Sequence, residues 1–145
     1  MKFSLTRIFF GIILCFSSSV FACSFAGLQY EVKFSENNAS LGAQEARELA
    51  EWFIDWRDGI GISYGYVFSN SIPDDRHTQA LAESRLKNIQ RLLEPLNKER
   101  KKIRYGNADF ERVSKEMWPY FLSVVTVGIQ PLCAETNTCC GGKYR

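Results

Sequence analysis

A strand, a polar segment and a long amphipathic helix follow one another in the middle of this 145-residue chain, and they restrict its fold more than any other feature. The apolar run Ile62–Phe68 predicts a strand, Ser69–Ser71 predicts a polar loop, and Thr78–Leu93 predicts a helix. Apolar residues recur every three or four positions along this helix and form one stripe: Ala82, Leu86, Ile89, Leu93 and Leu96. The stripe requires another layer of structure to cover it.

Asn70 and Arg85 are the candidate ligand-binding residues of this unit. A strand, a loop and a helix start can together hold an anion when a cation such as arginine lies nearby. Asn70 falls in the predicted loop, and Arg85 falls on the flank of the helix stripe. An arginine on a helix flank is more often solvated or paired with an acid, here Glu83 or Asp75. Both interpretations of Arg85 stay open on this pattern.

The remaining chain alternates strand and helix patterns. Strands are predicted at Tyr30–Phe34, Lys101–Tyr105 and Ser123–Ile129, and further helices at Ala43–Trp56 and Asp109–Met117. The predicted order is therefore β-α-β-α-β-(α)-β, an α/β (α+β) fold in which helices cover one face of a sheet.

The first residues predict export. Lys2 and Arg7 precede the apolar run Ile8–Phe16, and small residues follow, so residues 1–22 have the pattern of a signal peptide. Cleavage after Ala22 would give a soluble periplasmic protein. The segment before Cys23 also resembles a bacterial lipobox, and lipidation of Cys23 would tether the protein to the outer membrane. A membrane is expected as a partner only in the second case.

Removal of residues 1–22 leaves 123 residues, enough for one domain, which we place at 23–132 before a cysteine-containing tail at 133–145. The whole chain has 18 Lys and Arg against 16 Asp and Glu, and the signal peptide contains two of the cations and none of the acids. The mature chain therefore has 16 of each. This balance gives no indication of nucleic-acid binding, and none is expected.

The cysteines predict disulfides in an oxidising compartment. Four of them remain after the signal peptide, and these are the candidate disulfide residues: Cys23, Cys133, Cys139 and Cys140. A metal site is not expected, because His77 is the only histidine and no Cys-x-x-Cys pair is present. No paired nucleophile and base is visible either, so we expect neither catalytic residues nor a cofactor, and not an enzyme.

Two segments resemble those of a known family. Val32–Leu41 looks like an opening strand and turn in which phenylalanine precedes leucine by seven residues. Leu81–Ile89 looks like the helix motif Leu-Ser-x-x-Arg-Ala-x-x-Val, with Ala82, Leu86 and Ile89 as the replacements. In order and spacing, Tyr30 to Ile129 resembles the OmpA-like peptidoglycan-binding domain of bacterial cell envelopes. The resemblance implies a four-stranded mixed sheet with helices packed on one face, and first and last strands that are antiparallel neighbours.

The resemblance also implies a ligand. In that family the aspartate of a Gly-His-Thr-Asp loop and the helix arginine grip the diaminopimelate of the peptide stem. Arg85 matches the arginine, whereas Asn70 stands in place of the aspartate and keeps hydrogen bonding without the charge. Tyr120–Ser123 replaces the family's Asn-Arg-Arg lead into the last strand.

Two functions follow from these matches and departures. The first is a non-enzymatic exported envelope protein with weak peptidoglycan binding. The second is a periplasmic protein-binding module, such as an immunity or inhibitor protein, that has lost wall binding. The family topology also places the mature N-terminus near the tail, which implies a disulfide from Cys23 to the tail and another within the tail.

Overall fold

The computed structural model describes residues 28–109, 114–135 and 138–139. Four strands and three α-helices make up most of this part of the chain: β1 (Gln29–Lys33), α2 (Ala43–Gly59), β2 (Ile62–Ser71), α3 (Arg76–Leu93), β3 (Lys102–Asp109), α4 (Trp118–Ser123) and β4 (Val124–Pro131). Short 3₁₀ helices, η2 (Lys115–Met117) and η3 (Leu132–Ala134), precede α4 and follow β4. The order confirms the predicted alternation of strands and helices.

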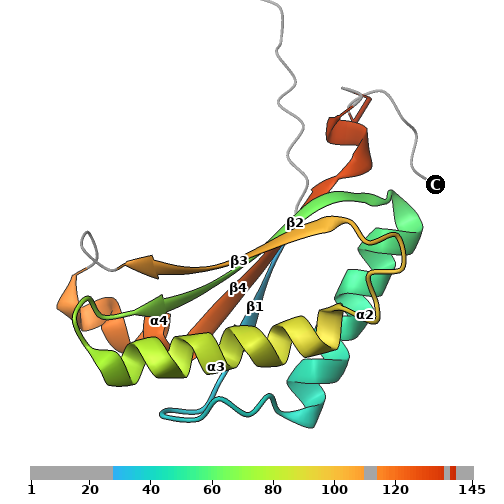
Figure 1. The fold of residues 1–145 in the computed structure, drawn as a ribbon. Helices are drawn as coiled ribbons and strands as arrows, with labels where there is room; N and C mark the ends of the chain where they lie inside the picture. Colours follow the sequence, from blue (N-terminus) through green and yellow to red (C-terminus); the bar gives the residue numbers. More distant parts are fainter. Residues whose placement is uncertain (1–27, 110–113, 136–137, 140–145) are drawn as a thin grey trace, which may run out of the picture.

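The strands form one mixed sheet with the order β1-β4-β2-β3. β4 is antiparallel to both β1 and β2, whereas β2 and β3 are parallel. The first and last strands are therefore antiparallel neighbours, as the family resemblance implies. Figure 1 shows the long helices α2 and α3 on one side of the sheet, which gives two layers.

The core lies between these layers. Alternate residues of the strands point to the helices because side chains on a strand change face at every residue. Aliphatic and aromatic side chains from the two layers meet there with at most 5% of their surface exposed: Val32, Phe34, Leu49, Phe53, Ile62, Val67, Ile89, Leu93, Val125, Val127 and Ile129. Most of these residues belong to the predicted apolar patterns.

Local signals set the ends of the long helices. The carboxylate of Asp75 accepts hydrogen bonds from the backbone N–H groups of His77 and Thr78 and so caps the start of α3. Gly61, just after α2, has a φ of +77°, which a glycine adopts without strain. Residues next to each helix end thus set the start of α3 and the end of α2.

The predicted loop at Ser69–Ser71 is wrong, because β2 continues through all three residues. β3 extends far enough to pair with this stretch, and Asn70 lies opposite Ala108. Ser69 and Ser71 are each 1% exposed. Their polarity suggested a loop, but the parallel partner strand supplies the backbone hydrogen bonds that a strand needs.

The short helix predicted at Asp109–Met117 lies later in the chain. Asp109 is the last residue of β3, and helical structure is described at Lys115–Met117 and Trp118–Ser123. Pro119 is in the first turn of α4, where its missing N–H costs little.

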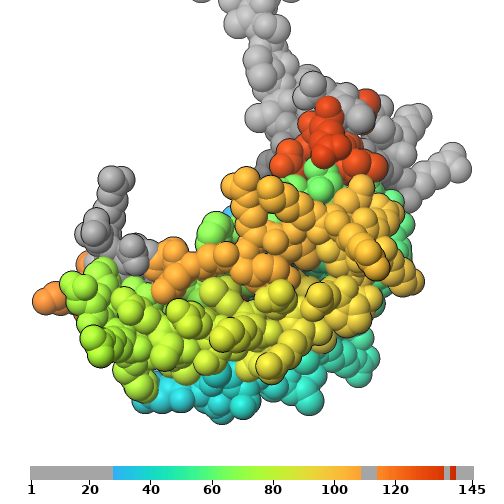
Figure 2. All heavy atoms as spheres, viewed as in Figure 1, coloured from blue at the N-terminus to red at the C-terminus, as the bar shows by residue number. Residues whose placement is uncertain are grey.

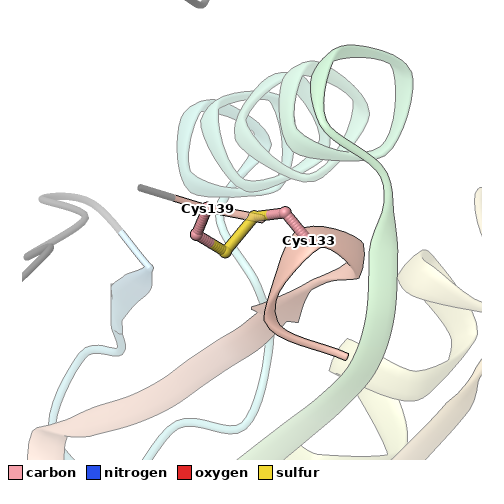
Figure 3. The surroundings of a disulfide bond; sticks show 2 residues. All are labelled: Cys133 and Cys139. Atoms are coloured by element: carbon pink, nitrogen blue, oxygen red, sulfur yellow. A yellow bond between two sulfur atoms is a disulfide. The ribbon is translucent and has the colours of Figure 1, made fainter. Parts of the chain in front are cut away.

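The chain after β4 is attached to the start of β2. The backbone N–H of Leu132 donates to the carbonyl of Gly61 at 3.0 Å, and the Ser63 hydroxyl donates to Glu135. Cys133 and Cys139 form a disulfide, as expected within the tail (Figure 3). Cys23 and Cys140 lie outside the described residues, so their pairing stays a prediction. Within those residues, no helix is long and apolar enough to cross a membrane.

Replacing Asp75 with alanine should lower the free energy of unfolding by about 1 kcal/mol, because the first turn of α3 loses its side-chain cap. Chemical denaturation of the purified protein measures this loss. Glu83→Ala, an exposed change on the same helix, is the matched control and should leave the unfolding midpoint almost unchanged. Equal effects of the two substitutions would contradict the capping role.

Candidate functional site

A cavity of about 560 Å³ lies at the end of the sheet where the last residues of β2 meet the start of α3. The turn after β1 and the helices η2 and α4 complete its wall. Polar, charged and aromatic side chains line it, among them Glu36, Asn70, Thr78, Arg85, Lys115 and Trp118. The structure thus brings together the two residues that the sequence predicts for ligand binding, Asn70 and Arg85.

Arg85 forms part of this wall and is also buried, with 2% of its surface exposed. Its Nε donates to the carbonyl of Asn38 at 2.9 Å and its Nη2 to the carbonyl of Ser35 at 3.0 Å. Its Nη1 donates to the carbonyl of Leu122, at the end of α4. One guanidinium therefore joins α3 to the turn after β1 and to the residues that lead into β4.

These contacts correct the prediction that Arg85 lies on the flank of a helix stripe. Ala82, Arg85, Ile89 and Leu93 are the buried residues of α3, so Arg85 is within the stripe. Neither Glu83 nor Asp75 pairs with it, and Asp75 caps the helix instead. Hydrogen bonds to backbone carbonyls of distant segments offset the free-energy cost of burying the charged side chain. A periodic sequence pattern does not reveal such carbonyls.

The turn after β1 is held closely. The N–H of Asn38 donates to the carbonyl of Ser35 at 3.1 Å, and Asn37 has a φ of 53°, a conformation that asparagine tolerates better than most residues. The amide of Asn88 donates to the carbonyl of Ala39 at 2.7 Å, one turn of α3 away from Arg85. α3 therefore fixes the turn that presents Glu36 to the cavity.

Among the described residues no carboxylate pairs with Arg85, and its three hydrogen-bond acceptors are all backbone carbonyl oxygens. The guanidinium also lies over the ring of Phe34, 4.9 Å from its centroid. Burial lowers the pKa of Arg85 below the ordinary value for arginine, although the group stays charged at neutral pH. A guanidinium has five N–H donors and these bonds use three, so the wall carries a positive charge with spare donors.

The side-chain amide of Asn70 forms a hydrogen bond through its nitrogen. Its Nδ2 donates to the carbonyl of Phe121 at 3.1 Å, which ties β2 to α4. The amide oxygen of Asn70 remains an acceptor for a ligand. The Thr78 hydroxyl, also in the wall, accepts from the N–H of Ile72 at 3.0 Å and so connects the first turn of α3 to the end of β2.

Sequence reasoning missed Glu36 and Lys115, which line the same cavity. Lys115 Nζ lies 5.9 Å from the centroid of the Trp118 ring. Glu36 comes from a turn and Lys115 from a 3₁₀ helix about 80 positions later, so no spacing in the sequence relates them. The one sequence signal near Glu36 is the turn sequence Ser-Glu-Asn-Asn, which predicts a turn rather than a binding site.

Comparisons with known proteins support the fold. No protein-family model matches the sequence, and no curated protein sequence matches it either. Among solved structures, the chain is similar to the OmpA-like domain of FopA1 from Francisella tularensis subsp. tularensis SCHU S4, with a TM-score of 0.54 and 18% sequence identity. The match covers 71% of this chain and 72% of the other. It confirms that this chain has a divergent OmpA-like fold.

Replacing Arg85 with alanine should lower the free energy of unfolding by about 3 kcal/mol, because three carbonyls would lose a charged donor and a buried space would open. Arg85→Lys should lose nearly as much, since one ammonium cannot match a planar guanidinium that reaches three oxygens.

Urea denaturation measures both losses. Arg91→Ala removes an exposed arginine from the same helix and should cost less than about 0.5 kcal/mol. A loss for Arg85→Ala as small as that of the control would contradict the structural role of Arg85.

Proposed function

We propose that the protein is a non-enzymatic, exported domain of the bacterial cell envelope whose cavity binds the peptide stem of peptidoglycan. One observation carries this proposal: Asn70 and Arg85, the two positions that correspond to the diaminopimelate-gripping residues of OmpA-like domains, line the same cavity. The OmpA-like fold adds support, because such domains are typically binding modules of the envelope.

The cavity has groups for both ends of an amino acid. Diaminopimelate presents a carboxylate beside an ammonium group. Arg85 offers a positive charge with spare N–H donors to the carboxylate. The Asn70 amide oxygen and the exposed Glu36 carboxylate offer acceptors to the ammonium. A neutral acceptor holds an ammonium less strongly than a carboxylate does, so binding is weaker than it would be with aspartate at position 70.

A second function is favoured by a different observation. Arg85 and Asn70 are both bonded within the protein, Arg85 to three carbonyls and Asn70 to the carbonyl of Phe121. Met117 and Tyr120 are exposed, and they flank the cavity-lining residues Trp118 and Pro119 in the sequence. In this case the former ligand residues stabilise the fold, and the protein acts in the periplasm by binding another protein through this end of the sheet.

Calorimetric titration with a stem peptide that contains diaminopimelate tests the first function. Wild type should bind saturably, and Asn70→Asp should bind about three- to tenfold more tightly because a carboxylate then faces the ammonium. Gln90→Glu adds the same charge on the exposed side of α3 and should leave the affinity unchanged. Because Asn70→Asp loses its bond to Phe121, the unfolding midpoint of each variant is measured alongside.

The outcomes separate the two functions. Absence of binding by wild type and by a folded Asn70→Asp variant would contradict the peptidoglycan proposal. The second function then predicts that wild type captures a partner protein from envelope extracts. Met117→Asp, which places a charge at an exposed apolar residue, should abolish this capture.

A further inference from the structure

The sheet has a second face, on the side away from α2 and α3 (Figure 1). Alternate residues of β2 point to this face, and three consecutive ones are aromatic: Tyr64, Tyr66 and Phe68. We name these three residues the aromatic row. Phe68 is 41% exposed, and the tyrosines are partly exposed. Among the described elements, no long helix covers the row.

Two glycines let rings of the row lie down on the sheet. Gly128 of β4 is the partner of Tyr66, and a Cβ at Gly128 would come within 2.0 Å of the Tyr66 ring. Gly106 of β3 is the partner of Phe68, and a Cβ there would lie 3.1 Å from the Phe68 ring. Each ring thus occupies space that a side chain on the neighbouring strand would fill, and so lies against the backbone of that strand.

The two rings make one low platform. The centroids of Tyr66 and Phe68 are 5.4 Å apart and their planes differ by 35°. Gln29 donates to the Tyr66 hydroxyl, which fixes that ring in place. Aromatic faces carry partial negative charge and attract C–H groups with partial positive charge, such as those on the apolar side of a pyranose ring.

The platform leads into the cavity. Asn70 is the next residue of β2 on this face after Phe68, and Asn70 lines the cavity. Two positions along a strand span about 7 Å, so a ligand group in the cavity and a ring stacked on Phe68 are within the reach of one molecule. A ligand that fills both places has a polar amino-acid part and a part with flat apolar faces.

The charges around the row favour an uncharged chain over a polyanion. Two cations, Lys102 and Arg104, lie on this face beside the row, and the Arg104 guanidinium stacks on Tyr64 at 5.6 Å. On the opposite edge the Glu31 carboxylate faces the same side and accepts from Tyr120. Nucleic acids bind through many phosphate contacts, and a mature chain with 16 basic and 16 acidic residues and an acid on this face does not favour them.

We propose that the aromatic row is a binding site for the glycan strand of the cell wall, a β-linked chain of N-acetylated hexosamines that stacks on Tyr66 and Phe68. The proposal rests on the proposed function, because it assigns the glycan and the peptide stem of one polymer to adjacent places on one domain. The neutral hydrogen-bonding side chains Thr126 and Gln130, on the same face of β4, are in reach of sugar hydroxyl and acetamido groups.

Nuclear magnetic resonance titration of the full chain with chitotetraose, an N-acetylglucosamine tetramer without peptide, tests the site directly. Wild type should show saturable shifts at the aromatic row and at Gly106 and Gly128. Phe68→Ala should weaken binding by about fivefold or more, because one exposed ring face is lost. Phe68→Trp keeps a ring face and should retain binding.

Leu132→Ala is the matched control, because Leu132 is also 41% exposed but lies beyond the end of β4. It should leave the affinity for chitotetraose unchanged. Unfolding midpoints confirm that the substituted proteins are folded.

The stem peptide is titrated separately, so that failure of the cavity and failure of the aromatic row give different results. Chitotetraose binding that depends on Phe68 supports the row even if the stem peptide does not bind. Absence of chitotetraose binding by wild type overturns the proposal even if the stem peptide binds. Binding of oligothymidylate at physiological salt, with Phe68 dependence and without chitotetraose binding, also overturns it and assigns the row to nucleic acid.

Discussion

The buried guanidinium of Arg85 holds together the end of the sheet on which the candidate site depends. It donates to Ser35 and Asn38 in the turn after β1 and to Leu122 before β4. These segments lie far apart in the sequence, and hydrogen bonds to their backbone carbonyls join them beside the ring of Phe34, over which the guanidinium lies. Water is largely excluded from the guanidinium, which makes each of these bonds stronger and makes the loss of any of them costly.

Arg85 can therefore have both a structural role and a ligand-binding role, because one does not exclude the other. A guanidinium fixed by three carbonyls keeps its plane and position before a ligand arrives. Two of its five N–H donors are outside these three bonds, and no carboxylate is among the acceptors of the three bonds. Preorganisation of this kind lowers the entropy that a ligand must overcome on binding. The internal bonds of Arg85 are thus compatible with either proposed function, and the acceptor at position 70 distinguishes them.

The sequence predicted the elements well where one periodic pattern was enough. The order of strands and helices follows from local apolar patterns, and the structure confirms it. The cap at Asp75 and the glycine at position 61 are local features as well. Asn70 and Arg85, which the sequence predicts for ligand binding, line one cavity, but their surroundings were not foreseen. Asn70 is in a strand because β3 extends to pair with it, and Arg85 is buried because carbonyls from residues 35, 38 and 122 satisfy it. Both facts depend on contacts between distant segments, which no local pattern encodes.

The two faces of the sheet differ in how their side chains pack. On the inner face, branched aliphatic side chains such as Val67 and Val127 stand up and interlock with α2 and α3. On the outer face, glycine at position 128 removes a side chain so that the Tyr66 ring can cover the backbone. A ring lying flat over glycine protects the sheet from solvent and still exposes an aromatic face. The proposed stacking of a ligand on Tyr66 and Phe68 depends on this arrangement. Asn70, which lines the cavity, follows Phe68 by two residues on β2, so both proposed binding places include residues of one strand.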